Sequence, residues 1–598
     1  MGYIGDRSAK EIIFTGLKRL EYRGYDSVGV AVADKTVHTQ KTVGNTSKLD
    51  LTSLPDKSTI GIGHTRWATH GKPSTTNAHP HTFGNITLVH NGIIENYEDL
   101  KSQFDASKLQ SQTDSEVLAG LIDACFSKTK DLLQATKTAL QQVKGTFGLV
   151  VMSPKAPDQL IVARRGSPIV IGVGAGQYYI ASDATAIIDH TDKVIYLEDD
   201  QLAVINRKSL DLYDLKLQHQ DAEVVKLDKL DHASELGGYT SYLEKEIFEQ
   251  PTAIQNVMRG RVGSDGSIVL GGPTLTQDEI LSLEHMVLVG CGSAFNAGYY
   301  AKYKLEEMLE IPVSVEYASE FRYRYGAFKP ERTLAIFLSQ SGDTADTLAS
   351  LREAKRRRLM TMGVVNSIGS TIAREVDHGG IYLHAGVETS VASTKAFTSM
   401  TIALLMFGGF LAHRRGLNHS VTRNLAHELK ALGKEFTATL ELKTAVDKLA
   451  KSLTNVHDVY YLGRGELFPT AVEGALKLTE VAYVHAQAFP TGEMKHGPIA
   501  LVDANHLSVL LLPEDEVLYD KGMAALQEIK AREGQVLTIS TRPKPSASDY
   551  HLQVAHAGHY TDGLVMNICS QLLALAIATN RGVNIDKPRN LAKSVTVE

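Results

Sequence analysis

The segment LAIFLSQSGDTADTL, residues 334–348, joins an apolar run to a polar turn that could bind an anion. The turn carries Ser339, Gln340, Ser341 and Thr344, and apolar residues at helical spacing follow it. A turn between a buried strand and a helix presents unpaired N–H groups at the positive end of the helix dipole. Hydroxyl groups add neutral donors without a competing anion, which favours phosphate. Since the same residues also favour ordinary helix caps, the segment alone leaves both interpretations open.

A second group of residues has the types needed for proton transfer. In EGALKLTEVAYVHAQAF, Lys477 and Glu480 lie three residues apart and would share one face of a helix from Ala471 to Tyr483. A pair at this spacing is more often a solvated salt bridge than a catalytic pair. His496, in TGEMKHGP, is by itself a loop residue, although its near-neutral titration suits proton transfer. Lys593 lies in LAKSVTVE, a tail that is apolar enough to pack.

Composition excludes several classes of partner. The chain of 598 residues is 43% hydrophobic, enough for several cores and three or four domains. Its formal charge of −6, with acids and bases interspersed, argues against nucleic acid and membranes as partners. Three widely separated cysteines fit neither a disulfide framework nor a zinc site, so we expect a cytoplasmic protein. No apolar run is long enough to span a bilayer, and no metal-ligand cluster or nucleotide fingerprint is visible, so we expect no metal and no cofactor.

The pattern of elements changes near residue 230. Up to about Asn206, short β-rich runs such as ITLVHNG and QLIVARRG are interrupted by helical stretches at Ala9–Leu20 and Ser115–Phe126. This pattern predicts sheets covered by helices. From about Tyr239 onward, strands, glycine-containing turns and long helices alternate, which predicts α/β domains.

The α/β region contains an internal repeat whose offset is constant along the chain. VLVGCGSAFNAG, with Gly290, aligns with YYLGRGELFPTA, with Gly463, and the same shift aligns the apolar strand at Leu334 with the one at Leu507. In the second copy the polar turn is replaced by LPEDEV, residues 512–517, which contains proline and carboxylates. The sequence therefore predicts two tandem domains, of which only the first has a turn suited to phosphate.

Several long motifs carry a resemblance to a known family. They are LEYRGYDSVG, GHTRWATHG, HNGIIENY and QTDSE in the N-terminal part, and SQSGDTADT, VASTKAFT, GEMKHGP and DKPRNLAKSVTVE in the remainder. In this order and at this length they resemble the glucosamine-6-phosphate synthases, the isomerizing glutamine:fructose-6-phosphate aminotransferases, over essentially the whole chain. The resemblance implies an N-terminal-nucleophile αββα sandwich that acts as a glutaminase, followed by two tandem sugar-isomerase (SIS) α/β domains with parallel sheets.

The resemblance also implies an organisation and a reaction. The expected ranges are 1–225 for the glutamine amidotransferase domain, 226–240 for a linker, 241–425 and 426–585 for the two SIS domains, and 586–598 for a tail that closes the active site. The implied substrates are fructose 6-phosphate and L-glutamine, and the implied product is glucosamine 6-phosphate, in the first step of hexosamine synthesis. Because the family uses a histidine from the neighbouring subunit, we expect a homodimer.

At the sugar site the resemblance assigns residues to binding and to catalysis. Phosphate binding falls on Ser339, Gln340, Ser341 and Thr344, and sugar contacts fall on Ser293, Val391 and Ser393. Ala294 stands where a serine is commoner, so one hydroxyl contact is absent or replaced by water. Glu480 would carry a proton between C1 and C2, with the positive charge of Lys477 beside it. His496 would assist ring opening, and Lys593 would form a Schiff base with the sugar carbonyl.

The glutamine site is assigned in the same way. Binding falls on Arg66, Thr69 and His70, an oxyanion hole on Asn91 and Gly92, and the amino group of glutamine on Asp114. An arginine for a carboxylate and an acid for an ammonium are complementary charges. Trp67, the only tryptophan, would gate the passage of ammonia. Without the resemblance, a single tryptophan in an apolar run would be interpreted as a core residue.

The start of the chain departs from the family pattern. Family members begin with Cys-Gly-Ile-Val-Gly, and the α-amino group of the cysteine acts as the base for its own thiol. This chain starts MGYIGDRSA, which retains GYIG and lacks the cysteine, and neither Cys125 nor Cys291 can combine thiol and free amine. We therefore expect the chain as printed to bind glutamine without hydrolysing it. A misplaced start is favoured over a chain that uses free ammonia only, because the other glutamine-site motifs are intact.

Two other functions stay open from the sequence. A sugar-phosphate sensor would need only the polar turn, and the presence of Glu480, His496 and Lys593 speaks against it. A plain sugar-phosphate isomerase follows if ammonia never reaches the sugar, and aldose phosphate without amino sugar would be its product.

Overall fold

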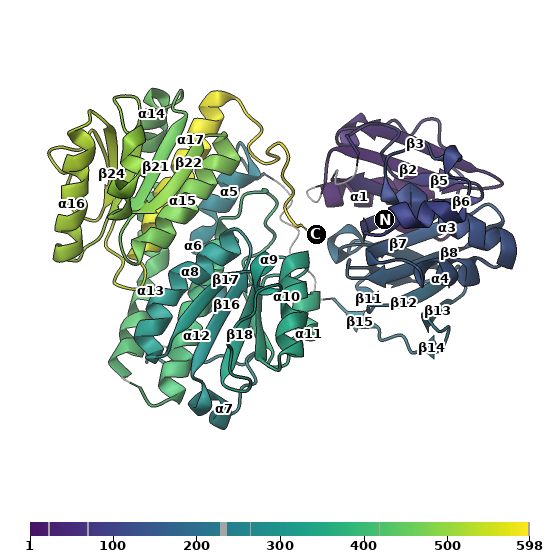
Figure 1. Cartoon of the computed structure of the whole chain (residues 1–598), viewed down its shortest axis with the longest axis horizontal. Helices are drawn as coiled ribbons and strands as arrows, with labels where there is room; N and C mark the ends of the chain where they lie inside the picture. Colours follow the sequence, from purple (N-terminus) through teal and green to yellow (C-terminus); the bar gives the residue numbers. More distant parts are fainter. Residues whose placement is uncertain (22–23, 68–70, 228–235, 264, 418, 596–598) are drawn as a thin grey trace. The chain divides into compact units, whose positions relative to one another are not determined.

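The computed structural model of the chain describes residues 1–21, 24–67, 71–227, 236–263, 265–417 and 419–595 (Figure 1). By its contacts the chain divides into two compact units. The first unit contains residues 1–231 together with the short segments 343–345 and 592–598, and the second contains residues 232–342 and 346–591. The boundary between residues 231 and 232 lies where the pattern of the sequence changes.

The first unit is built on two antiparallel sheets. The eight-stranded sheet has the order β15-β11-β9-β10-β1-β4-β2-β3, and the seven-stranded sheet has the order β14-β13-β12-β8-β7-β6-β5. The strands of the larger sheet are β1 (Gly2–Ile4), β2 (Ser27–Ala33), β3 (Val37–Val43), β4 (Ile60–Arg66), β9 (Val170–Gly174), β10 (Gln177–Ala181), β11 (Lys193–Tyr196) and β15 (Val225–Lys226). The strands of the smaller sheet are β5 (His81–Phe83), β6 (Ile86–Ile94), β7 (Gly145–Ser153), β8 (Ala156–Arg165), β12 (Gln201–Asn206), β13 (Leu210–Asp214) and β14 (His219–Gln220).

The sheets of the first unit pack face to face, with helices on their outer faces. In β2, the valines Val28, Val30 and Val32 belong to the core beneath helix α1 (Ala9–Leu20), whereas Ala31 and Ala33 belong to the core between the sheets. This alternation follows because successive side chains of a strand point to opposite faces. The smaller sheet is covered by α3 (Asp114–Thr129) and α4 (Leu132–Leu140). The predicted αββα sandwich is confirmed.

Short elements connect these layers. They are α2 (Tyr97–Leu100) and the 3-10 turns Thr46–Lys48, Lys101–Gln103, Ala106–Lys108 and Ala184–Ala186. Helix α3 begins one residue before the predicted start because the Thr113 side chain accepts the Glu116 N–H and caps it.

The second unit contains two five-stranded parallel sheets with the same strand arrangement. Their orders are β17-β16-β18-β19-β20 and β22-β21-β23-β24-β25. The first sheet consists of β16 (His285–Gly290), β17 (Val313–Tyr317), β18 (Thr333–Ser339), β19 (Met360–Val365) and β20 (Gly380–Tyr382). The second consists of β21 (Asp458–Gly463), β22 (His485–Pro490), β23 (Leu507–Leu512), β24 (Gln535–Ser540) and β25 (Tyr550–Gln553). The predicted tandem repeat with parallel sheets is confirmed, because β16 and β21 are related by the same shift that relates Gly290 to Gly463.

Helices cover both sheets of the second unit. Those of the first half are α5 (Tyr242–Phe248), α6 (Gln250–Met258), α7 (Gln277–Ser282), α8 (Ser293–Leu309), α9 (Ala318–Phe321), α10 (Ala345–Arg356), α11 (Thr371–Glu375), α12 (Lys395–Arg414) and α13 (His419–Leu440). Those of the second half are α14 (Lys443–Ser452), α15 (Leu467–Ala482), α16 (Glu516–Lys530) and α17 (Asp562–Arg581), with 3-10 turns at Glu493–His496 and Pro498–Leu501. One continuous core joins the two halves through α8, α12, α15 and α17.

Two of these helices are long and apolar enough to cross a membrane by length and composition. Helix α12 and helix α17 each have 20 residues, and 94% and 89% of their most apolar windows are buried within the protein. Helix α12 is longer than the apolar run TIALLMFGGFLA that lies within it. Burial of this extent is that of core helices, which pack against α8 and α15.

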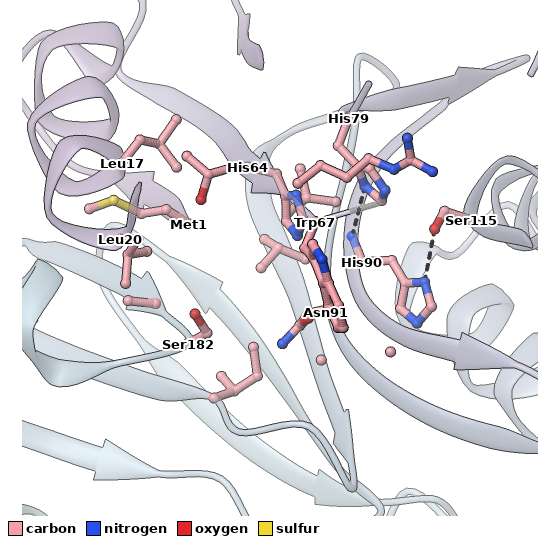
Figure 2. A pocket seen from close by; sticks show the side chains of 18 of the residues that line it. Met1, Leu17, Leu20, His64, Trp67, His79, His90, Asn91, Ser115 and Ser182 are labelled. Carbon is pink, nitrogen blue, oxygen red and sulfur yellow. Dashed lines mark hydrogen bonds between the residues drawn. The ribbon is translucent and has the colours of Figure 1, made fainter. Parts of the chain in front are cut away.

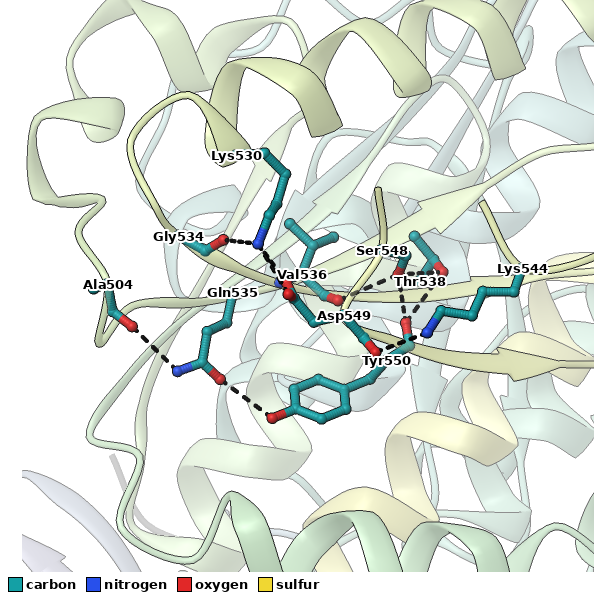
Figure 3. A network of polar contacts seen from close by, with 10 residues as sticks. All are labelled: Ala504, Lys530, Gly534, Gln535, Val536, Thr538, Lys544, Ser548, Asp549 and Tyr550. Atoms are coloured by element: carbon teal, nitrogen blue, oxygen red, sulfur yellow. Dashed lines mark hydrogen bonds and ion pairs between the residues drawn. The ribbon is translucent and has the colours of Figure 1, made fainter. Parts of the chain in front are cut away.

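A polar network holds the outer part of the second sheet (Figure 3). The Asp549 carboxylate accepts the Val536 N–H at 2.7 Å and pairs with Lys530 of α16 at 2.9 Å. The Thr538 Oγ1 lies 2.9 Å from the Ser548 Oγ. These contacts tie β24 to the segment that leads into β25.

Candidate active site

The second unit brings together side chains from α8 and α15 beyond the carboxyl end of β16. Ser293 is the first residue of α8, and Glu473, Lys477 and Glu480 lie at intervals of four and three residues along α15, on one helical face. The Lys477 Nζ lies 3.0 Å from the Ser293 Oγ and 3.3 Å from the Glu473 Oε1, and it also pairs with Glu480. The cluster therefore joins the first half of the repeat to the second.

Sequence reasoning misses Glu473, whose side chain is fully buried. Its carboxylate accepts hydrogen bonds from the Ser293 hydroxyl at 2.9 Å and from the Asn296 amide at 2.7 Å. Burial raises the pKa of Glu473, and the Lys477 ammonium and the two hydrogen bonds oppose this rise. Helical spacing could have revealed the residue, because Glu473 precedes Lys477 by one turn in EGALKLTE.

Lys477 is a buried positive charge next to an accessible carboxylate. Burial alone would lower the pKa of Lys477, but the carboxylates of Glu473 and Glu480 outweigh burial and raise it. Lys477 therefore stays protonated at neutral pH. The Glu480 side chain is 16% exposed, compared with 2% for Lys477 and none for Glu473, so Glu480 is the most accessible of the three to a ligand.

The polar turn follows β18, which neighbours β16 in the same parallel sheet. Ser339 is the buried last residue of β18, and its Oγ accepts the Gly342 N–H at 2.9 Å and lies 3.5 Å from the Ser341 Oγ. Gln340 and Thr344 are half-buried. Because parallel strands have their carboxyl ends at one edge of the sheet, the turn and Ser293 lie at the same edge.

Val391 and Ser393 lie in the loop between β20 and α12, and both are half-buried. The Val391 N–H donates to the Asp586 carbonyl at 3.1 Å. Glu388, a second residue that sequence reasoning misses, is buried and accepts the N–H groups of Thr394 and Ala396 at 2.9 and 3.0 Å. A buried carboxylate thus fixes the end of this loop at the start of α12.

The other two residues predicted for catalysis, His496 and Lys593, come from segments other than α8 and α15. His496 is exposed and ends the 3-10 turn Glu493–His496. Lys593 is half-buried in the segment after α17, whose described residues from Ala592 onward are grouped with the first unit. The roles of both residues stay predictions.

In the first unit, most of the residues predicted for glutamine line one pocket (Figure 2). Arg66 and Trp67 come from the end of β4, Asn91 and Gly92 from β6, and Asp114 from the start of α3. Figure 2 also shows Met1, His64 and His90 around the same pocket. Thr69 and His70 lie outside the described residues.

The pocket is lined by a positively charged side chain, Arg66, and a negatively charged one, Asp114. Arg66 is buried and donates to the Gly71 carbonyl at 3.2 Å. Asp114 is buried and accepts the Ile94 N–H at 2.8 Å. A guanidinium and a carboxylate in one pocket complement the two charged ends of an α-amino acid.

The whole chain aligns with curated proteins that are named as aminotransferases. The glutamine–fructose-6-phosphate aminotransferase (isomerizing) of Bacteroides thetaiotaomicron is 43% identical over 613 aligned positions, which cover 100% of this chain and 99% of the relative. The chain belongs to the glutamine–fructose-6-phosphate aminotransferase family. The family's protein from Thermus thermophilus is 41% identical over 611 positions, again with 100% and 99% coverage.

Domain and structure comparisons agree with membership of this aminotransferase family. A glutamine amidotransferase domain model matches residues 64–189, and a SIS domain model matches residues 279–408 and 452–581. The C-terminal domain of the glucosamine–fructose-6-phosphate aminotransferase of Francisella tularensis is similar to 59% of this chain over its full length, with 37% identity and a TM-score of 0.56. The two SIS matches coincide with the two parallel sheets.

Beside the pocket of its first unit, this aminotransferase-family chain has three buried histidines, His79, His81 and His90, and a half-buried one, His64. The His64 and His79 rings stack with centroids 4.4 Å apart, and the His81 ring meets His79 edge-on at 4.6 Å. The His90 Nδ1 lies 2.9 Å from the Ser115 Oγ. Among the described residues, no group of three or more His, Cys, Asp or Glu side chains could hold a metal ion. The rings pack against one another, and His79, His81 and His90 also have hydrogen-bond partners.

We expect this histidine cluster to make the first unit of the aminotransferase acid-sensitive. Burial lowers the pKa of His64, His79 and His81 well below the usual value of about 6.5. Below about pH 6.5 these histidines bind protons in the unfolded chain but stay neutral in the folded unit. The free energy of unfolding is therefore highest above about pH 6.5. It decreases as pH falls, by up to about 1.4 kcal/mol per histidine per pH unit. Fluorescence of Trp67, the only tryptophan, monitors unfolding of this unit between pH 7.5 and 5.5.

Two variants test the cause of this acid sensitivity. His81→Gln keeps a polar group within reach of the Thr113 hydroxyl, 3.1 Å from the His81 ring, and should flatten the loss of stability by about a third. His38→Gln, at a half-exposed site on β3, is the matched control and should leave the slope unchanged. An identical slope in both variants would refute the role of the cluster.

Proposed function

We propose that this chain makes glucosamine 6-phosphate from fructose 6-phosphate, with nitrogen from L-glutamine in the family's reaction and from free ammonia in the chain as printed, which lacks the nucleophilic cysteine. The observation that carries the proposal is the buried Lys477 between Glu473, Glu480 and Ser293, at the sheet edge that also holds the Ser339–Thr344 turn. The relatives that align with the full length of the chain are named for this reaction.

The polar turn is proposed to bind the phosphate. Ser339, Gln340, Ser341 and Thr344 would supply hydroxyl and amide donors, with the backbone N–H groups at the start of α10. Ser293, Val391 and Ser393 would contact the sugar. The equivalent turn in the second half contains Glu514 and Asp515, whose charges repel phosphate, so the first half is the one suited to this ligand.

Catalysis needs ring opening, a carbonyl held by an amine, and proton transfer between C1 and C2. Glu480 is proposed as the base, because it is the most accessible carboxylate of the cluster. The fixed positive charge of Lys477 beside it would stabilise an enolate-like oxygen in the transition state. His496 is proposed to assist ring opening, and Lys593 to form the Schiff base.

The first unit is proposed to supply the nitrogen. Arg66 would bind the carboxylate of glutamine and Asp114 its ammonium, while Asn91 and Gly92 would stabilise the oxyanion. Thr69 and His70 would complete the binding site, and Trp67 would gate the passage of ammonia. We further propose that the protein acts as a homodimer in the cytoplasm.

Product analysis tests the proposal directly. The chain is incubated with fructose 6-phosphate and either glutamine or ammonium, and glucosamine 6-phosphate, glutamate and aldose phosphate are quantified. Amino sugar in either reaction supports the proposed synthesis, and amino sugar with equal glutamate supports glutamine as donor. Aldose phosphate alone indicates a sugar-phosphate isomerase, and binding of fructose 6-phosphate without any product indicates a sensor; both results overturn the proposal.

The Schiff base can be trapped chemically. The Lys593 amine would attack the C2 carbonyl of fructose 6-phosphate with loss of water, and borohydride would then deliver hydride to C2 and fix the sugar as a secondary amine. Peptide mass spectrometry should locate this adduct on Lys593, and the adduct should disappear in Lys593→Arg. Trapping at another lysine with Lys593 unmodified would contradict the assignment.

Gly342→Ala should weaken binding of fructose 6-phosphate. Gly342 has φ of +69°, and a Cβ there would collide with the Ser370 side chain. The left-handed conformation costs a non-glycine residue roughly 1–2 kcal/mol. We expect the turn to shift and the KM for fructose 6-phosphate to rise about tenfold, since about 1.4 kcal/mol corresponds to a factor of ten.

Gly416→Ala is the matched control for this prediction. Gly416 has φ of +71°, and a Cβ there would meet no atom within 4 Å. This variant has the same backbone cost without the collision, and its KM should equal that of the wild type. Equal KM values for the two variants would show that the turn does not bind the substrate.

A further inference from the structure

The contact that defines the candidate active site occurs a second time between the same two helices. The shift that aligns Gly290 with Gly463 also relates Lys304 of α8 to Lys477 of α15, and Ser293 to Glu466. Lys477 contacts Ser293 at one end of the crossing, and Lys304 pairs with Glu466 at the other. Helices α8 and α15 therefore cross with approximate two-fold symmetry. We call the Lys304–Glu466 contact and its neighbours the twin site.

In the twin site, Lys304 and Glu307 contact side chains from the segment that precedes α17. Glu307, the counterpart of Glu480, lies 2.8 Å from the His559 Nε2 and accepts a hydrogen bond from the Tyr560 hydroxyl at 3.4 Å. The Lys304 Nζ lies 3.2 Å from the same His559 nitrogen and 5.5 Å from the centre of the Tyr560 ring. The Lys304 side chain is 1% exposed. The counterparts of Lys477 and Glu480 are therefore engaged by His559 and Tyr560, and the His559 and Glu307 side chains remain 54% and 45% exposed.

The segment that contains His559 and Tyr560 is itself held by two carboxylates, of which Asp562 is buried and Glu428 is half-buried. Glu428 of α13 accepts the Tyr560 N–H at 2.8 Å. Asp562, the first residue of α17, accepts the N–H groups of Ala557 and Gly558 at 2.7 and 3.0 Å. Fixed in this way, the segment keeps His559 and Tyr560 against α8.

We propose that the Lys304–Glu466 ion pair is a positioning device for the active site. It fixes α8 against the start of α15, eleven residues along α8 from Ser293, and so sets the register in which Ser293 meets Lys477 and Glu473. Buried ion pairs contribute little net stability but can select one arrangement of two elements. The inference rests on the proposed synthesis of glucosamine 6-phosphate, whose rate then depends on residues that never touch the sugar.

The test removes both charges, because one buried charge without its partner destabilises a protein by itself. In the double variant Lys304→Met/Glu466→Gln we expect kcat with ammonium to fall about tenfold, since small misplacement of catalytic groups is costly. The KM for fructose 6-phosphate should change less than kcat, because the phosphate turn follows β18, outside α8 and α15, and only the Ser293 contact to the sugar is disturbed. The conservative variant Glu466→Asp, which keeps the charge, should retain most of the wild-type kcat.

Lys302→Met is the matched control on the same helix. Lys302 is 32% exposed and lies 3.9 Å from Glu306, a surface pair whose loss should not change kcat. A double variant with wild-type kcat overturns the proposal, as does a KM that rises by a larger factor than kcat falls. The proposal is also overturned if kcat of the Glu466→Asp variant is as low as that of the double variant.

A crystal structure of the double variant separates this inference from the proposed function. The distance from the Lys477 Nζ to the Ser293 Oγ, 3.0 Å here, should exceed hydrogen-bonding range when the ion pair is gone. An unchanged distance overturns the inference. If the wild-type chain makes no amino sugar, the proposed function fails, and this distance still decides whether the ion pair sets the register.

Discussion

Glu480→Gln is expected to lower kcat for amino-sugar formation by about 10²–10⁴-fold, the usual contribution of a general base. Glutamine has the shape of glutamate, and its amide oxygen can still accept from Lys477, which pairs with Glu480 in the wild type. The amide cannot take up the proton that must move between C1 and C2. The fall should therefore be in kcat with little change in the KM for fructose 6-phosphate, because phosphate binding depends on a separate turn.

Initial rates with ammonium as the nitrogen source measure this effect without involving the glutamine pocket. Glu441→Gln, at an exposed position between α13 and α14, removes the same charge from the second unit and serves as the control. A Glu480→Gln variant within tenfold of wild-type kcat would exclude Glu480 as the base. The proton transfer would then have to be assigned to another group of the cluster.

The fold follows from the sequence where its causes are local. Short β-rich runs such as ITLVHNG and QLIVARRG predict strands of the first unit, and the constant offset of the internal repeat predicts two similar α/β halves. Element boundaries are less well predicted. Helix α15 starts at Leu467, four residues before the predicted start, because Pro469 falls in its first turn, where no N–H partner is required.

The site is only partly predictable, because burial and long-range contacts are not local properties. Lys477 and Ser293 are 184 residues apart, and nothing in either neighbourhood shows that their side chains meet. The repeat offset relates the two residues of this contact to Lys304 and Glu466, which form a second contact between the same helices. Glu480 is assigned through the family resemblance, whereas the burial of Glu473 against α8 depends on packing that the local sequence does not show.

Glu473→Leu should destabilise the second unit by about 3–5 kcal/mol, the usual cost of breaking a buried charged network. Leucine removes the acceptor of the Ser293 hydroxyl and of the Asn296 amide, and buried donors without acceptors cost about 1–3 kcal/mol each. It also leaves Lys477 with one carboxylate partner in place of two. Glu473→Gln, which keeps the shape and one carbonyl acceptor, should lose less than half as much stability.

The two units allow this stability to be measured with an internal control. Urea unfolding of the second unit is followed by far-ultraviolet circular dichroism, to which its many helices contribute strongly, whereas Trp67 fluorescence reports the first unit alone. In Glu473→Leu the helical transition should move to lower urea while the Trp67 transition stays in place. A helical transition at the wild-type midpoint would mean that Lys477, Ser293 and Asn296 find other partners. Glu473 would then not be the residue that holds the two halves of the site together.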